Sequence, residues 1–256
     1  IYLAVRRANR RIVLANAAID FDRLLFIDQP YPQGSEWPHQ ARHRNGFMAM
    51  PGGRLLVLSG LRPGGGIRKL ADLPPGSYWK PDLSFDASRA AFCYKANDEE
   101  AFHLYEVGLD GSGLRKITEG PDDDLDPIYL PDGGFAFVTT RGKTYVRCMP
   151  YTRSNVLARC DAEGSHIRII SVNSEPDWHP ALLPDGRILF SRWEYQDKAL
   201  WRIMALWRVR PDGTQMEVFW GNQSVWPDHP TEARHIPDTS KVIFTGTAHH
   251  DYFAGS

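Results

Sequence analysis

The residues best suited to chemistry lie at the two ends of one stretch, residues 177–195, which reads DWHPALLPDGRILFSRWEY. Two short apolar runs flank the Pro-Asp-Gly turn at 184–186, and this predicts a tight hairpin, because proline fixes one turn dihedral and glycine accepts a positive φ. His179 precedes the first run, whereas Arg192 and Tyr195 follow the second. A hairpin therefore brings these three side chains together at the end opposite the turn.

One interpretation of this group is an enzyme active site. His179, or His250 near the end of the sequence, would act as the base, Tyr195 as the acid, and Arg192 would neutralise a substrate carboxylate. Such a set suits a lyase or hydrolase of an anionic polysaccharide. The alternative is structural. His179 would hydrogen-bond a loop carbonyl, Arg192 would pair with an acidic loop, and Trp193 would pack between two repeat units.

A second interpretation is a divalent-metal site built from His179, His249, His250 and Cys148. Neighbouring side chains of an extended segment point to opposite sides, so only one of His249 and His250 could face the centre of the fold. No spacing motif such as H-E-x-x-H accompanies these residues. The structural interpretation of His179 therefore stays open, and a divalent metal is the one cofactor that these residues suggest.

Two other polar features favour structural interpretations. Residues 119–126 (EGPDDDLD) hold five acids, but the ligand order of a calcium-binding EF-hand is absent, so we expect a solvated loop. Cys160 precedes a turn within an expected strand, which is typical of a buried cysteine. A disulfide between Cys148 and Cys160 is the alternative.

Strand–turn–strand units recur along the chain and predict an all-β fold. Asp-Gly turns start at residues 110, 161 and 212, an even step of 51, and a short alternating run precedes and follows each. Each unit then has four antiparallel strands, which matches a propeller blade. We expect one propeller domain over 1–256, with degenerate strands (11–15 and 23–27) and a loop over 1–45, blades over 46–73, 78–120, 126–171 and 177–220, and a truncated blade over 231–256. About five blades form a partial ring, a fragment of a six- or seven-bladed propeller.

This architecture assigns the turns and the chemical residues to opposite faces. If Pro-Asp-Gly turns join the first two strands of a blade and Asp-Gly turns join the last two, both turn types lie on one face. The other face receives the links before the first strand and after the second, which hold His179, Arg192, Tyr195 and His250. Loops from several blades on one face are the usual way in which a propeller forms a site.

The repeat resembles the TolB-type, WD40-like (PD40) propeller repeat, in the run LYEVGLDGSGLRKIT at 104–118 and in residues 180–190. A longer series of blocks resembles a family of large planctomycete-type proteins that share a propeller with the middle domain of the hydrazine synthase alpha subunit. These blocks are FDRLLFID (21–28), PGGRLLVL (51–58), KPDLSFDAS (80–88), the run 104–133, WHP (178–180), SRWEYQDK (191–198) and AHHDYFAGS (248–256).

The resemblance implies a periplasmic or otherwise extracytoplasmic propeller within a multidomain chain, in some relatives beside c-type haem modules. Haem attachment needs C-x-x-C-H. Cys148 is followed by Met-Pro-Tyr and Cys160 by Asp-Ala-Glu, so we expect no covalent haem in this segment. Met204 and Ala205 stand where relatives carry a His pair, which argues against a site that uses those histidines.

Composition narrows the function further and leaves a binding module as our first hypothesis. The chain has 30 Lys and Arg against 31 Asp and Glu, a net charge of −1, so no field favours nucleic acid. No apolar run approaches the roughly 20 residues of a membrane span. The chain opens on Ile1 without Met, and we read it as a piece of a longer protein. We expect an extracytoplasmic module that binds either a ligand, such as a carbohydrate, or a partner. The partner would be another domain of the same chain or a second protein. The alternative is an enzyme.

Overall fold

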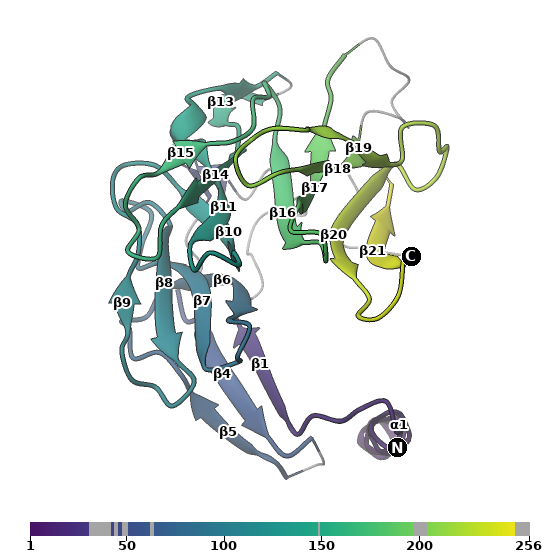
Figure 1. Ribbon diagram of the computed structural model, residues 1–256. Helices are drawn as coiled ribbons and strands as arrows, with labels where there is room; N and C mark the ends of the chain where they lie inside the picture. Colours follow the sequence, from purple (N-terminus) through teal and green to yellow (C-terminus); the bar gives the residue numbers. More distant parts are fainter. Residues whose placement is uncertain are drawn as a thin grey trace.

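The computed structural model describes residues 1–30, 42–43, 46–47, 51–61, 64–147, 149–196 and 204–248. Over these residues the chain is nearly all-β, as predicted, and its small antiparallel sheets follow one another along an arc (Figure 1). A helix, α1 (Tyr2–Leu14), lies at the N-terminal end of the arc, and a short 3₁₀ helix, η1 (Thr140–Gly142), follows one strand. The partial propeller predicted from the repeats is confirmed.

Three consecutive sheets have four strands each, and the strands are adjacent in chain order. They are β6 (Ser77–Leu83), β7 (Arg89–Lys95), β8 (His103–Gly108) and β9 (Arg115–Lys116); then β10 (Asp124–Tyr129), β11 (Phe135–Thr139), β14 (Val156–Cys160) and β15 (Arg168–Ile169); then β16 (Asp177–Leu182), β17 (Ile188–Trp193), β18 (Met204–Val209) and β19 (Glu217–Trp220). In an antiparallel sheet of this order, the turn between the first two strands and the turn between the last two lie at the same end. The two turn types therefore share one face, as expected.

Smaller sheets flank these three units. They are β1 (Arg23–Asp28) with β4 (Arg54–Ser59) and β5 (Gly66–Lys69), β20 (His229–His235) with β21 (Val242–Thr247), and two hairpins, β2 (Arg42–His43) with β3 (Gly46–Phe47) and β12 (Tyr145–Val146) with β13 (Met149–Arg153). β1 pairs with β4 over its whole length. The strand expected over 23–27 therefore joins the sheet of the unit expected over 46–73.

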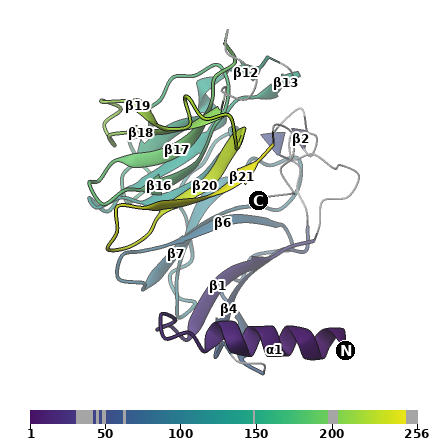
Figure 2. The same cartoon turned by 90° about the vertical axis from the view of Figure 1, so that its right-hand side faces the viewer.

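The N-terminal segment corrects one prediction, because the strand expected over 11–15 is the end of α1, an amphipathic helix of 13 residues. The run Ile-Val-Leu at 12–14 has the composition of a strand, but arginines at 6, 7, 10 and 11 recur with the spacing of a helix. The Arg10 guanidinium donates to the Leu61 carbonyl at 2.7 Å, and Figure 2 shows α1 beside β1 and β4. Within the described segments, no helix has the length and hydropathy that crossing a membrane requires.

The hydrophobic core lies between consecutive sheets. Phe102, Phe135, Phe137 and Phe190 are at most 2% exposed and belong to one cluster that spans the three four-stranded units. Burying each such side chain contributes about 1.5–3 kcal/mol. The inner strands β6, β10, β16 and β20 contact one another in this order, so the sheets surround a common centre (Figure 1).

Candidate functional site

Each of the four inner strands is interrupted by a β-bulge at the same place. The register shifts fall at residues 79–82 in β6, 125–128 in β10, 178–181 in β16 and 231–234 in β20. Within these bulges Lys80, Asp126, His179 and Glu232 have positive φ angles of 39°, 53°, 51° and 54°. We name these four residues the axial cluster, because the inner strands that carry them face the common centre (Figure 1).

The backbone of the axial cluster is strained in a way that points to a site. A positive φ at a residue other than glycine costs about 1–3 kcal/mol, and such positions concentrate at ligand-binding and catalytic sites. A bulge also turns one side chain out of the regular alternation of its strand. All four bulges here present an ionisable side chain, each of a different type.

Contacts between units join these side chains. Lys80 Nζ forms an ion pair with the Glu232 carboxylate. Asp126 Oδ2 accepts a hydrogen bond from the backbone N–H of His179 at 3.2 Å, and His179 Nδ1 shares a hydrogen bond with the Thr231 hydroxyl. The axial cluster therefore groups one ammonium, two carboxylates and one imidazole from the first strands of four units.

Burial shifts the pKa of the two most enclosed members of the cluster. It raises the pKa of Asp126, whereas the positive charge of Lys80 acts in the opposite direction. Burial also lowers the pKa of His179 well below its usual value, and Lys80, His229 and Arg234 lower it further. His179 is therefore neutral near neutral pH, and Asp126 Oδ1 is buried without a hydrogen-bond partner among the described residues.

We expect the charge of Asp126 to reduce stability at neutral pH. A carboxyl group whose pKa is raised in the folded state stabilises the fold when protonated, and this contribution is lost as the pH rises through the folded-state pKa. The stability of Asp126→Asn relative to the wild type should therefore rise between about pH 4 and about pH 7, measured by urea unfolding. Asp132→Asn is the control, because the hydrogen bond from Arg159 lowers the pKa of Asp132, so the relative stability of this variant should fall as the pH rises toward about 5 and change little above it. Parallel trends in the two variants would contradict this account of Asp126.

The residues that the sequence grouped into one site have different contacts in the structure. His179 lies in the axial cluster on β16, whereas Arg192, on the paired strand β17 of the same sheet, is buried, and its Nε and Nη2 contact the two carboxylate oxygens of Asp177 at 2.8 and 3.0 Å. Tyr195 is 40% exposed, and its carbonyl accepts a hydrogen bond from Arg147 at 2.7 Å. Arg192 pairs with a carboxylate, as the structural interpretation expected, but this carboxylate, Asp177, lies on the paired strand and not in an acidic loop. The catalytic roles of His179, Arg192 and Tyr195 stay predictions.

The metal interpretation depends on residues that the structure describes only in part. Cys148, His249 and His250 lie outside the described residues, and so does the catalytic role expected for His250. Among the residues described, no three His, Cys, Asp or Glu side chains are grouped as metal ligands. The divalent-metal site stays a prediction. Cys160 is a free and buried thiol, as the favoured interpretation expected.

The acidic run EGPDDDLD is buried at its centre, so the expectation of a solvated loop is wrong. Residues 122–124 are at most 4% exposed. Asp124 pairs with Arg141 at 2.6 Å, and Asp123 accepts a hydrogen bond from the Phe102 N–H at 2.8 Å. The partner of Asp124 follows the next strand of the same sheet, and the partner of Asp123 lies in the preceding unit. The local sequence reveals neither contact.

Sequence reasoning missed Lys80, Asp126 and Glu232 as neighbours of His179, although a signal was present. Lys80, Asp126 and His179 each precede a proline. In addition, positions 126, 179 and 232 follow one another at intervals of 53 residues. Alignment of the units on these positions, and not only on their turns, would have placed the four side chains together.

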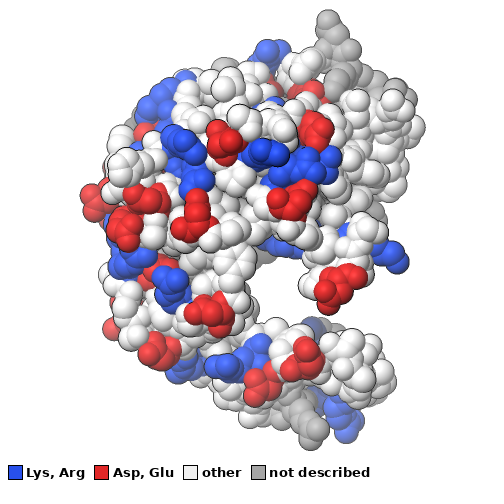
Figure 3. All heavy atoms as spheres, viewed as in Figure 1, with Lys and Arg blue, Asp and Glu red and all other residues white. Residues whose placement is uncertain are grey.

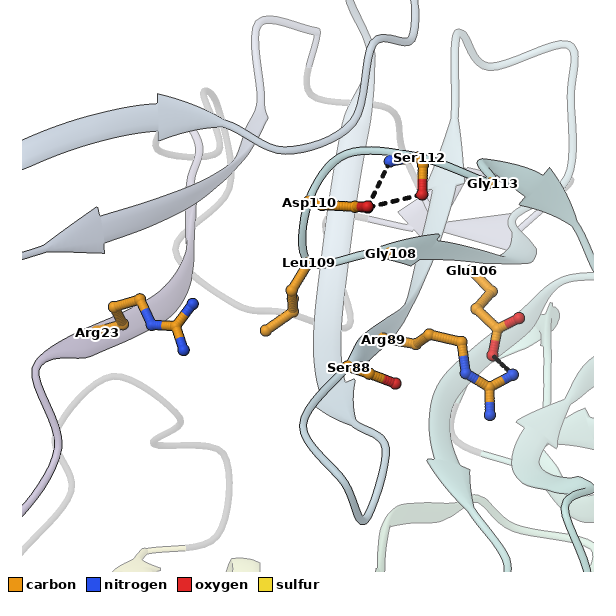
Figure 4. A pocket seen from close by; sticks show the side chains of 9 residues that line it. All are labelled: Arg23, Ser88, Arg89, Glu106, Gly108, Leu109, Asp110, Ser112 and Gly113. Carbon is orange, nitrogen blue, oxygen red and sulfur yellow. Dashed lines mark hydrogen bonds and ion pairs between the residues drawn. The ribbon is translucent and has the colours of Figure 1, made fainter.

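Two hollows elsewhere offer no comparable set of groups. One of about 540 Å³ lies between Arg23 and the sheet of strands β6 to β9 (Figure 4), where Arg89 contacts Glu106 at 3.1 Å and Asp110 accepts hydrogen bonds from Ser112. Its charged groups therefore largely satisfy one another. The other, of about 950 Å³, lies between α1 and strands β1 and β4. On the face shown in Figure 3, basic and acidic side chains are interspersed over the sheets.

Radial four-stranded sheets around a centre lined by first strands define a β-propeller. No family model matches the sequence, and no curated protein matches it. Among solved structures, hydrazine synthase of Kuenenia stuttgartiensis matches 90% of this chain at 17% identity, with a TM-score of 0.74. The match covers 36% of the hydrazine synthase chain, so this chain spans about a third of that length.

Two further solved structures support the same fold. An oligogalacturonate lyase from Vibrio parahaemolyticus matches 89% of this chain and 60% of its own, at 18% identity and a TM-score of 0.56. TolB from Acinetobacter baumannii matches 76% of this chain and 46% of its own, at 13% identity and a TM-score of 0.50. At these identities the likeness shows the fold, a TolB-like propeller that resembles hydrazine synthase.

Proposed function

We propose that this chain is an extracytoplasmic propeller module of a larger protein, and that it binds a ligand, or a group of a partner, at the axial cluster. The partner would be another domain of the same chain or a second protein. The extracytoplasmic location is carried over from the families that the sequence resembles. The binding role is supported by residues of this chain.

The observation that carries the proposal is a contrast between two neighbouring repeat positions. Asp124 and Asp177 open β10 and β16, and each holds an arginine, Arg141 or Arg192, through both carboxylate oxygens. A position with the same role in two units serves the architecture of the repeat. Two residues later, the bulged position carries a different ionisable side chain in each of four units. An asymmetric ligand requires such diversity, whereas the repeated fold does not.

A binding screen tests the proposal. Ligand-observed NMR with the purified chain would survey oligosaccharides, peptides, small carboxylates and amines. We expect a ligand whose affinity falls at least about tenfold, or about 1.4 kcal/mol, in both Lys80→Met and Asp126→Asn. Glu163→Gln, in the exposed turn between β14 and β15, should leave that affinity unchanged. A panel without any ligand, or ligands that bind the variants as tightly as the wild type, would overturn the axial site.

An enzyme is the second candidate, because His179 is a neutral imidazole under the influence of two cations, Lys80 and Arg234. A neutral base beside cations that hold a carboxylate suits proton abstraction from an acidic sugar, as in a lyase of anionic polysaccharide. One of the structures with this fold is an oligogalacturonate lyase. The uronate oligosaccharides of the same panel would show new unsaturated ends if the chain cleaves them, and His179→Ala should abolish the signal. A panel that stays uncleaved would remove this candidate.

A further inference from the structure

The axial cluster contains opposite charges held at fixed places on different strands. Lys80 on β6 and Arg234 on β20 both act as positive charges on Asp126 and on His179. Arg234 donates to the Pro180 carbonyl at 3.3 Å, which ties it to the strand that carries His179. The two cations belong to inner strands on either side of β10 along the arc, β6 before it and β20 beyond β16.

One buried carboxylate oxygen of the axial cluster has no hydrogen-bond donor among the described residues. Asp126 is 6% exposed, and while its Oδ2 accepts the His179 N–H, its Oδ1 accepts no hydrogen bond from the described residues. A buried acceptor without a donor costs about 1–3 kcal/mol, and more when it is charged. The nearby ammonium of Lys80 forms its ion pair with Glu232. A donor supplied from outside the chain would complete Asp126.

A metal ion fits this requirement poorly. Among the residues that the structure describes, the side chains that could join Asp126 as ligands are Glu232, which is paired with Lys80, and His179, whose Nδ1 is hydrogen-bonded to Thr231. An ammonium group needs only acceptors, and a charge-assisted hydrogen bond from an ammonium to a buried carboxylate is among the strongest available. An isolated amine would leave Arg234, which among the described residues donates to backbone carbonyls, without an ion-pair partner, whereas a carboxylate on the same ligand would approach both Arg234 and Lys80.

We propose that the axial cluster binds the zwitterionic head of a free α-amino acid. Its ammonium donates to Asp126 Oδ1, and its carboxylate lies against the Lys80 and Arg234 side chains. Lys80 carries three N–H donors, so it can hold Glu232 and the ligand together. This inference rests on the proposed function and specifies the ligand of the same site.

Four small molecules of matched size test the inference by calorimetric titration of the purified chain. L-Alanine carries both charges, N-acetyl-L-alanine lacks the ammonium, L-alaninamide lacks the carboxylate, and L-lactate replaces the ammonium with a hydroxyl. We expect L-alanine to bind at least about tenfold more tightly than each of the other three. Asp126→Asn and Lys80→Met should each weaken L-alanine at least about tenfold, and Glu163→Gln should not.

The outcomes separate the two proposals. L-Lactate binding as tightly as L-alanine would overturn the zwitterion while keeping an axial ligand site. Silence from all four compounds, with another ligand of the NMR panel lost in Lys80→Met, would also overturn the zwitterion alone. Silence from the four compounds and from the panel would end both proposals. Urea unfolding of each variant identifies a folding defect, and Lys80→Met then decides if Asp126→Asn does not fold.

Discussion

Arg192→Met should lower the free energy of unfolding by about 3–5 kcal/mol, the usual cost of removing one partner from a buried ion pair. Asp177 is fully buried, Arg192 is 7% exposed, and the guanidinium contacts both oxygens of the carboxylate. Methionine keeps much of the length and apolar surface of the arginine but leaves the charge of Asp177 unpaired. Urea unfolding followed by tryptophan fluorescence measures the loss.

Arg54→Met is the matched control, because Arg54 forms an ion pair with Asp28 in which both side chains are about half exposed, 56% and 48%. Exposed pairs contribute about 0–1 kcal/mol, so this variant should stay close to the wild type. Adding Asp177→Asn to Arg192→Met should restore part of the stability, since it removes the buried charge. If Arg192→Met were as mild as the control, Arg192 would not be the structural residue that its contacts indicate.

These buried ion pairs also position the candidate site. Asp124 and Asp177 are the first residues of β10 and β16, and each lies two residues before a member of the axial cluster, Asp126 or His179. The guanidinium contacts fix the start of the strand, and the bulge that follows then directs the side chain toward the centre. The strain of a positive φ at the bulge is offset by these anchors and by the interlocked core.

The fold was predictable because its signals are local and repeat. The turn at 184–186 and the apolar runs beside it fix a hairpin and its register as far as Ala181 and Leu189, whereas the bulge before Ala181 shifts the register to the one that pairs Asp177 with Arg192. The helix α1 was missed because the strand-like run at 12–14 was read in too short a window. Its arginine spacing becomes visible only over the whole segment 2–14.

The site was predictable only in part, because it depends on geometry between units. His179 was found as an unusual residue beside a strand. Arg192 was assigned to the same site because it follows the second run of the hairpin, but the buried carboxylate of Asp177 on the paired strand decides where its side chain lies. Asp126 was read as part of an acidic loop, since a period-two pattern contains no sign of a bulge. Side chains 46 to 53 residues apart in the sequence become neighbours only once the arc of sheets is known.

Gly164→Ala should lower the free energy of unfolding by about 2–5 kcal/mol, for a reason that also explains the recurring Asp-Gly turns. Gly164 has a φ of +80°, which costs other residues about 1–2 kcal/mol. A Cβ at this position would also lie 1.8 Å from the carbonyl oxygen of Ile117 in the preceding unit, and relieving such a clash costs about 1–3 kcal/mol more. The turn at the outer edge of one unit is therefore pressed against the backbone of the unit before it, and urea unfolding measures the loss.

Two other glycines of the same turn series provide graded controls. A Cβ on Gly213 would lie 3.1 Å from the Ile170 carbonyl oxygen, and a Cβ on Gly111 would lie no closer than 3.5 Å to its neighbours, while both residues also have a positive φ. Gly111→Ala should therefore cost only the backbone term of about 1–2 kcal/mol, and Gly213→Ala should fall between Gly111→Ala and Gly164→Ala. Equal losses for the three variants would show that turn conformation alone requires glycine. A graded series would mean that packing between successive units selects the residue, and that the even spacing of these turns records the stacking of sheets that brings the axial cluster together.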